Sequence, residues 1–267
     1  MPETVAILGI PLDENSSFLR GAALAPPRIR EALWSESSNS WTELGVDLGS
    51  EPQLEDLGDL TLSTGAAAIA EIEAAVDAAL SRGARVLSLG GDHSVTYPIL
   101  RAYARAYPRL TILHFDAHPD LYDEFEGNRF SHASPFARIM EEGLAARLVQ
   151  IGIRTMSGPQ MVQVERFGVE VVDMRRFRPG LTLELEGPVY VTVDLDAFDP
   201  AFAPGVSHHE PGGLTTRDVV DVILGVEAPI VGADVVEYNP TRDVVGITGM
   251  LAAKLAKELA GRMLEHL

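Results

Sequence analysis

The sequence predicts an α/β fold in which a mostly parallel β-sheet is covered by helices on both faces. Short apolar runs typical of strands alternate along the chain with longer amphipathic segments typical of helices. The strand runs lack a polar face, as expected of parallel strands that are buried on both sides. Hydrophobic residues make up 46% of the 267 residues, which is enough for a large core.

Eight segments are predicted as strands, because branched and large aliphatic residues fill them and glycine, proline or polar residues bound them. In chain order the expected strands are residues 4–10, 56–62, 85–89, 110–115, 147–152, 169–173, 188–194 and 230–236.

Seven segments are predicted as helices, and most of them fall between the strands. They are residues 26–34, 66–82, 96–107, 135–142, 157–167, 215–225 and 249–266. Pro26 and Pro27 suit a first helical turn, and the segment 66–82 carries apolar residues at helical spacing. Residues 35–54 lack periodicity and are expected to form a surface loop. Because the pattern continues without a break, residues 1–267 are predicted to form a single domain.

Composition excludes several classes of protein. The formal net charge of −18 argues against binding to nucleic acid or to an anionic membrane. The absence of cysteine excludes disulfides, thiolate metal sites and cysteine nucleophiles. No apolar segment approaches the ~20 residues of a membrane helix, and the first apolar run reaches Asp13 too soon for a signal peptide. We therefore expect a cytoplasmic protein without nucleic-acid or membrane partners.

Polar residues follow four of the predicted strands, at the point where each strand ends. These motifs are GGDHS (90–94), DAHPD (116–120), DLDAFDP (194–200) and EYNP (237–240). Parallel strands place all four ends at one edge of the sheet, where ligands bind in open α/β sheets. Side chains two residues apart point the same way in an extended chain, so Asp116, His118 and Asp120 are expected to face one space.

The acidic and imidazole side chains at these strand ends are predicted to bind metal, because carboxylates and imidazoles are ligands for divalent Mn, Fe, Co or Zn. The predicted ligands are His93, Asp116, His118, Asp120, Asp194 and Asp196. This set carries too much negative charge for one ion and suits two divalent cations that share bridging carboxylates. Nearby, His114 is predicted to be a hydrogen-bonded core histidine, and Asp92 and Asp199 are predicted to support ligands or cap turns.

The segments GGDHS, DAHPD, DLDAFDP and VVEYNP resemble, in order and spacing, the signature segments of the ureohydrolase family of arginases, agmatinases and their relatives. The loops NSSFLRG, APPRIREALW, FEGNRFSHASPFARIM and FAPGVSHHEPGG are most similar to those of plant-type arginases, which themselves look more like agmatinases than like animal arginases. The resemblance implies a three-layer α/β/α sandwich, two Mn²⁺ per subunit and a homotrimer or homohexamer. It places one metal on His93, Asp116, Asp120 and Asp194, and the second on Asp116, His118, Asp194 and Asp196.

The implied reaction is the hydrolysis of a small cationic guanidino substrate. Two cations that share a water lower its pKa toward neutrality, and this metal-bridging hydroxide would convert L-arginine to L-ornithine and urea. Glu237 is expected to orient the guanidinium through a bidentate hydrogen bond, and His132 is expected to carry a proton to the departing amine. Asp120 is assigned a catalytic role beside its role as a ligand. A metal-binding protein without activity is disfavoured because Glu237 and His132 are present, and a zinc deacylase of related topology is disfavoured by the number of carboxylates.

The far end of the substrate is where arginine and its competitors differ. The alternatives to arginine are agmatine, giving putrescine and urea, and another guanidino acid. Animal arginases place an aspartate that binds the α-amino group shortly after a motif that corresponds to Gly152-Ile153-Arg154. Here residues 155–157 (TMS) contain no acid, which weakens the case for arginine. The plant-type loops strengthen it. The predicted contacts of the α-carboxylate are Asn15, Ser16, Asn128 and Ser131. His208, His209 and Glu210 are left as either substrate contacts or part of a surface loop.

Overall fold

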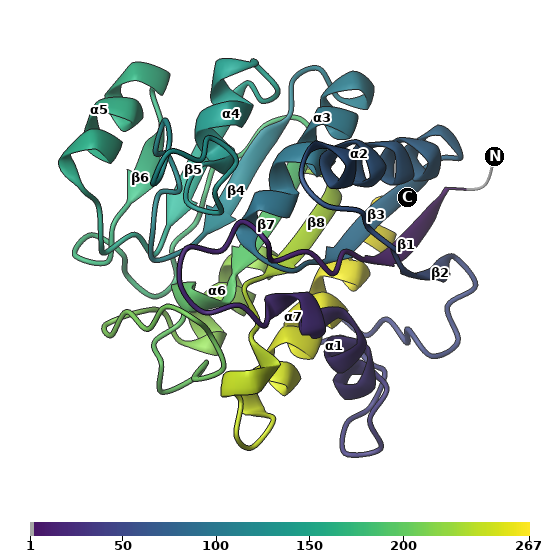
Figure 1. Ribbon diagram of the computed structural model, residues 1–267. Coiled ribbons are helices and arrows are strands. Elements are labelled where there is room, and N and C mark those ends of the chain that lie inside the picture. Colours follow the sequence, from purple (N-terminus) through teal and green to yellow (C-terminus); the bar gives the residue numbers. More distant parts are fainter. Residues whose placement is uncertain (1–2) are drawn as a thin grey trace.

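The computed structural model describes residues 3–267 and shows one parallel sheet between two layers of helices (Figure 1). Its strands are β1 (Thr4–Gly9), β2 (Leu54–Asp59), β3 (Ala84–Leu89), β4 (Thr111–Phe115), β5 (Arg147–Ile151), β6 (Glu170–Val172), β7 (Val189–Asp194) and β8 (Ile230–Val236). Their order is β2-β1-β3-β8-β7-β4-β5-β6, and every neighbouring pair is parallel. The predicted α/β class and the implied three-layer sandwich are confirmed.

Helices pack on both faces of the sheet. They are α1 (Ala25–Leu33), α2 (Ala66–Ser81), α3 (Thr96–Ala106), α4 (Pro135–Glu141), α5 (Gly158–Phe167), α6 (Thr216–Leu224) and α7 (Ile247–Leu264). Helices α2 to α5 cover one face, and α1, α6 and α7 cover the other (Figure 1). Each face has its own apolar core, with Ile72 of α2 in the first and Leu255 of α7 in the second. Within residues 3–267, no helix combines the length and the apolar character that crossing a membrane requires.

The predicted elements are all present, with ends that differ by a few residues. Strand β2 and helix α7 each begin two residues before the predicted position, at Leu54 and Ile247 respectively. Capping boxes begin α5 and α6, where Ser157 and Thr215 each exchange hydrogen bonds with the residue three positions later. One sheet runs through the described chain and supports the single domain, which stays a prediction.

The four strands that are followed by polar motifs are neighbours at the centre of the sheet, in the order β3-β8-β7-β4. Their register is level, because Leu89 and Val193 both pair with Val235, and Phe115 pairs with Val193. The carboxyl ends of these four strands therefore meet at one place on the sheet edge.

Candidate metal centre and active site

The six predicted metal ligands come together at the carboxyl ends of the central strands. Strand β4 ends at Phe115, so the extended geometry expected through the DAHPD motif does not continue. Instead, the Asp116 carboxylate accepts a hydrogen bond from the His118 backbone N–H at 2.6 Å, and Asp120 adopts a left-handed φ of 50°. Such a φ costs about 1–2 kcal/mol at a residue other than glycine. A turn, and not the alternation of side chains, gathers the three predicted ligands.

His93 is the centre of one group of ligands. Its Nδ1 atom lies 3.2 Å from Asp116 Oδ2, 3.1 Å from Asp120 Oδ2 and 3.2 Å from Asp194 Oδ2. All four side chains are buried, and Nδ1 makes no hydrogen bond. Buried polar atoms rarely stay unpartnered, and a nitrogen that faces three carboxylate oxygens suits a divalent cation. This group is the first ligand set that the family resemblance implies.

A second group shares Asp116 with the first. His118 Nδ1 lies 3.3 Å from Asp116 Oδ1 and 3.1 Å from Asp196 Oδ2. Asp116 thus presents one oxygen to each group, as a bridging ligand does. Asp194 accepts a hydrogen bond from the Asp196 backbone N–H at 2.8 Å, and its carboxylate joins the first group of potential ligands but not the second.

The charges in this cluster favour added positive charge. Burial, together with the charges of Asp196 and Asp116, raises the pKa of Asp194 well above its usual range. Burial and the charge of Asp116 also raise the pKa of Asp120. Burial by itself would lower the pKa of His93, but the neighbouring carboxylates raise it. Because divalent cations would relieve the same repulsion, the donor set, the burial and the unpartnered nitrogen together fit a metal centre.

His114 forms, with His93 and Asp116, a third group that could hold a metal ion, but both of its ring nitrogens already have hydrogen-bond partners. The Gln150 amide donates a hydrogen bond to His114 Nδ1 at 3.0 Å. The proton of the ring is therefore on Nε2, which lies 2.9 Å from Asp116 Oδ2 and donates to it. The predicted hydrogen-bonded core histidine is confirmed, and its partner is a metal-site carboxylate.

Glu237 and His132 form a buried pair beside the cluster. Glu237 has a left-handed φ of 65°, and its Oε1 accepts hydrogen bonds from His132 Nδ1 and from the His93 backbone N–H, each at 2.9 Å. Burial by itself would lower the pKa of His132, but the charge of Glu237 raises it to about 9. The other ring nitrogen of His132 lies 2.8 Å from the Ser17 hydroxyl. A histidine that keeps its proton at neutral pH can donate it to a leaving group.

A cavity of about 300 Å³ connects the cluster with this pair. Residues of the cluster and of the pair that line it are His118, Asp120, His132, Asp194, Asp196 and Glu237. The other lining residues, called the outer wall below, are Ser17, Tyr122, Phe125, Ala133, Thr155, Met156, Ser157, Gln160 and His208. Burial lowers the pKa of His208, so the outer wall offers hydroxyl, amide and neutral imidazole groups. This volume and this mixture of groups suit a small molecule.

The predicted contacts of the substrate tail lie elsewhere. Asn128 donates a hydrogen bond to Asn15 Oδ1 at 3.2 Å, and both residues line a separate hollow of about 330 Å³. Ser131 is buried and accepts a hydrogen bond from the Ala133 backbone N–H. The Ser16 hydroxyl donates to Asp92 at 3.2 Å. Contact of these four residues with a substrate stays a prediction.

Other polar residues of the motifs support loops. Asp92 accepts hydrogen bonds from the backbone N–H groups of Ser94 and Asn15, and Asp199 accepts from those of Ala201 and Gly212. The supporting roles predicted for both aspartates are confirmed. His208 lines the cavity, with its ring centroid 5.3 Å from that of His132.

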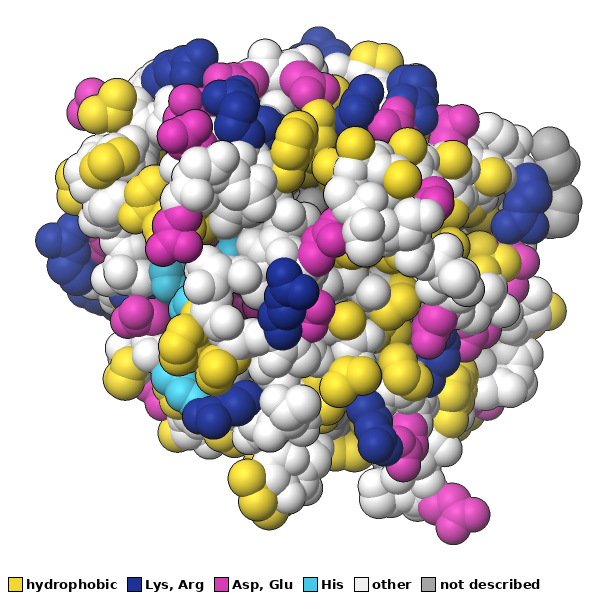
Figure 2. Space-filling view, viewed as in Figure 1, with side chains coloured by type: hydrophobic (Ala, Val, Ile, Leu, Met, Phe, Trp, Pro, Cys, Tyr) yellow, Lys and Arg dark blue, Asp and Glu magenta, His cyan; other side chains and the backbone are white. Residues whose placement is uncertain are grey.

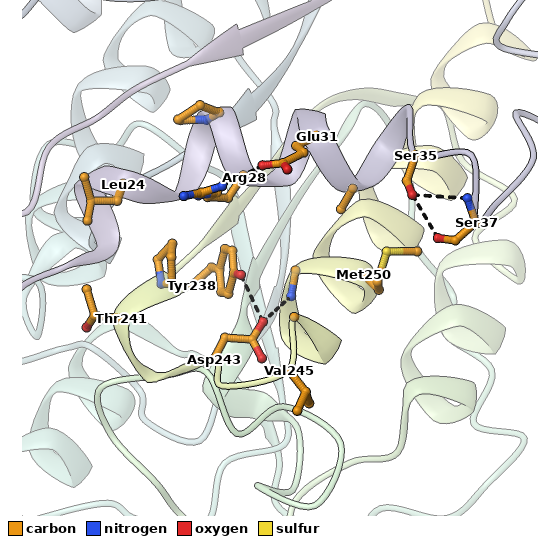
Figure 3. A pocket seen from close by; sticks show the side chains of 15 residues that line it. Leu24, Arg28, Glu31, Ser35, Ser37, Tyr238, Thr241, Asp243, Val245 and Met250 are labelled. Carbon is orange, nitrogen blue, oxygen red and sulfur yellow. Dashed lines mark hydrogen bonds and ion pairs between the residues drawn. The ribbon is translucent and has the colours of Figure 1, made fainter.

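A wider hollow elsewhere has different chemistry. It has a volume of about 960 Å³ and lies between α1 and the start of α7 (Figure 3). Its Asp243 carboxylate is held by the Tyr238 hydroxyl and the Gly249 backbone N–H, each at 2.9 Å, and no histidine lines it. The space-filling view shows histidine side chains, in cyan, only in the left half of the visible face (Figure 2).

Comparison with known proteins agrees with this geometry. A model described as the arginase family matches residues 3–261. The chain belongs to the arginase family. Within this family it is 50% identical to Arginase 1, mitochondrial, from Arabidopsis thaliana, over 97% of this chain and 81% of that protein. It is 37% identical to an agmatinase from Neisseria meningitidis, over 95% of this chain and 85% of that protein.

The fold of this arginase-family chain also matches solved structures. The structure of the arginase from Medicago truncatula has a TM-score of 0.92 and 47% sequence identity, and the match covers 98% of this chain and 87% of that chain. The resemblance to arginases and agmatinases that the sequence motifs indicate is confirmed.

The expectation of a cytoplasmic location is wrong. The Arabidopsis thaliana relatives carry the names Arginase 1, mitochondrial, and Arginase 2, chloroplastic/mitochondrial, and point to organelles. The expectation rested on the lack of a secretory signal and of a membrane helix. These features separate secreted and membrane proteins from the proteins of every aqueous compartment, so they could not single out the cytoplasm.

Proposed function

We propose that this chain is an arginase, which hydrolyses the guanidinium group of L-arginine to give L-ornithine and urea. The observation that carries the proposal is a single cavity in which a His/Asp cluster suited to metal adjoins the buried pair of Glu237 and His132. Identities of 47–50% to the Arabidopsis thaliana proteins named arginase, against 34–37% to two bacterial proteins named agmatinase, support arginine as the substrate.

Two divalent cations, Mn²⁺ by the family resemblance, would be held by the six ligands of the cluster. The ligands of the first would be His93, Asp116, Asp120 and Asp194. Those of the second would be Asp116, His118 and Asp196, and the family resemblance adds Asp194 to them. When bound, the cations would supply a water that ionises near neutral pH.

Glu237 would hold the guanidinium. Both of its hydrogen bonds, to His132 and to the His93 backbone, use Oε1, which leaves Oε2 for a substrate N–H group. A buried carboxylate beside a planar cation makes strong, charge-assisted hydrogen bonds and fixes the orientation of the cation. Asp120 lines the same cavity, and we assign it to accept a hydrogen bond from the water that reacts.

His132 would supply the proton that the leaving amine needs. When the bond from the guanidinium carbon to the side-chain nitrogen of arginine breaks, that nitrogen takes a proton and departs as a primary amine. His132 lines the cavity and, with a pKa of about 9, holds a proton at neutral pH. The Ser17 hydroxyl at its Nε2 holds the ring in place.

The test is urea release from L-arginine, agmatine and 4-guanidinobutyrate by the manganese-loaded protein. We expect the highest kcat/KM with L-arginine. Agmatinase is the second candidate, because Thr155, Met156 and Ser157 of the outer wall provide no carboxylate for an α-ammonium group. A kcat/KM for agmatine far above that for arginine would overturn the arginase proposal.

We also infer a homotrimer or homohexamer from the family resemblance. Large apolar side chains on the surface support association, since Val244 is 95% exposed and Val245 80% exposed. Light scattering of the purified protein would measure the assembly, and a monomer would contradict this inference.

A further inference from the structure

A row of buried polar side chains crosses the sheet directly beneath the metal ligands. In order across the sheet, this polar row consists of Ser88, Asp234, Thr192, His114 and Gln150. Each residue pairs in register with the next one on the adjacent strand, and all five are 0% exposed. Asp194 and Asp116 follow Thr192 and His114 by two residues. Uncompensated polar groups are expensive to bury, so a polar row in the interior of a parallel sheet calls for an explanation.

Asp234 is the acidic member of the polar row, and its hydrogen-bond donors are all hydroxyl groups. Its Oδ1 accepts from the Thr192 hydroxyl at 2.6 Å. Its Oδ2 accepts from the Tyr190 hydroxyl at 2.8 Å and from the Thr96 hydroxyl at 2.9 Å. Asp234 lies in β8, Thr192 and Tyr190 in β7, and Thr96 at the start of α3.

The contact between Asp234 and Thr192 determines how Thr192 meets His93. A threonine hydroxyl has one hydrogen, and here Asp234 accepts it. The Thr192 oxygen, 3.0 Å from His93 Nε2, can then only accept, so Nε2 carries a proton. In the neutral ring this leaves the lone pair on Nδ1, the atom that faces three carboxylate oxygens.

We propose that Asp234 is a positioning residue for the metal centre, which acts through the Thr192 hydroxyl to hold His93 with Nδ1 directed to the metal. The inference rests on the metal site of the proposed function. It predicts an effect on metal binding by the group that contains His93 and none on the group that contains His118 and Asp196. Groups that orient metal-bound histidines commonly change metal affinity about 10–100-fold when they are removed.

A purely structural role for Asp234 would give different results. The same carboxylate joins β7, β8 and α3, so any change in it could destabilise the fold without affecting metal binding selectively. Thr192→Val and Thr96→Val separate the two roles, because each removes one buried hydroxyl from the same carboxylate and only Thr192 also contacts His93. Tyr190→Phe serves as a second control, because the Tyr190 hydroxyl donates to the same Asp234 oxygen as the Thr96 hydroxyl.

Asp234→Asn gives the sharpest test. Since two hydroxyls donate to Oδ2, the amide oxygen should take that position and place the NH₂ group against Thr192. The Thr192 hydroxyl would then accept from the amide and donate to His93 Nε2. The ring proton would move to Nδ1 and remove the lone pair from the metal.

The experiment titrates the metal-free, full-length variants with MnCl₂ by calorimetry and measures urea-induced unfolding in parallel. We expect Asp234→Asn and Thr192→Val to weaken one manganese-binding step by about 10–100-fold and to leave the other unchanged. Thr192→Ser keeps the hydroxyl group and should therefore bind manganese with the affinity of the wild type. Thr96→Val and Tyr190→Phe should lower the unfolding midpoint but leave both binding steps as in the wild type.

Equal losses of affinity in the Thr192→Val and Thr96→Val variants, or wild-type affinity in Asp234→Asn, would overturn the role of Asp234. If Asp234→Asn does not fold, the two valine variants decide the question. Wild-type protein that binds manganese but releases no urea from arginine would count against the proposed function alone.

Discussion

Glu237 Oε1 lies 2.9 Å from His132 Nδ1, and the negative charge of Glu237 is what keeps the pKa of the buried His132 high. Burial works in the opposite direction. If the carboxylate becomes a neutral amide of the same shape, burial meets less opposition, because only the charges of Asp120 and Asp92 remain to raise the pKa of the ring.

Glu237→Gln should therefore lower the pKa of His132 from its value of about 9. An NMR titration of the histidine ring protons in the metal-free protein measures this change. The exposed Glu227→Gln is the matched control and should leave the titration of His132 where it is. An unchanged midpoint in Glu237→Gln would show that another group sets the proton affinity.

His132→Asn should reduce kcat without reducing metal content. The variant keeps a polar side chain but cannot donate a proton to the departing amine, and the loss of a general acid commonly costs about 10²–10⁴-fold in rate. Urea release and bound manganese, measured on the same preparation, test both statements. His209 is exposed and bonded to the Pro204 carbonyl, so His209→Asn should retain full activity. A wild-type rate in His132→Asn would remove the proton-donor role.

Asp116→Asn should impair both metal positions. Its two oxygens face His93 and His118 separately, and the His114 ring donates to one of them. Asp196→Asn, by contrast, should affect mainly the group that contains His118. Metal analysis after dialysis should find little bound manganese in the first variant and more in the second. Equal manganese content in the two variants would argue against Asp116 as the bridge.

The strands and the clustering of the acidic and imidazole side chains could be predicted because their signals are local. Parallel strands that are buried on both faces appear as apolar runs, and the motif DAHPD stands directly after such a run. Level strand ends then bring His93, Asp116 and Asp194 together without any further information.

The turn at Asp120 and the outer wall of the cavity could not be predicted in this way. A left-handed φ at Asp120 or Glu237 is imposed by the surrounding structure and has no signature in composition. Ser17, Phe125 and Gln160 come from three separate segments and are ordinary loop and helix residues until the fold places them beside one another. Asp234 does carry a signal in the sequence, because an acidic residue in the middle of an apolar strand needs buried hydrogen-bond partners.

Gly91→Ala should destabilise the protein and disturb the loop of residues 13–18. A Cβ atom at Gly91 would lie 1.7 Å from the Leu12 carbonyl oxygen, so the backbone must move. Overpacking of this kind costs about 1–3 kcal/mol in the free energy of unfolding. Gly158→Ala, where nothing lies within 4 Å of the added atom, is the control and should be neutral or stabilising. Urea-induced unfolding compares the two, and equal midpoints would contradict the prediction.

Asp194→Asn should change stability in opposite directions with and without metal. Burial and two neighbouring aspartates raise the pKa of Asp194 in the folded, metal-free protein. The stability that this group contributes is therefore fully present below the ordinary pKa of aspartic acid, about 4, and is lost as the pH rises through the raised value. Asparagine carries no charge at any pH, so the metal-free variant should lose less stability than the wild type as the pH rises from about 4 through the raised pKa of Asp194. With manganese in excess the order should reverse, because only the wild type gains the binding energy of the bound ion. Urea-induced unfolding with and without a chelator measures both comparisons, and a difference between the two proteins that does not vary with pH would exclude a raised pKa at Asp194.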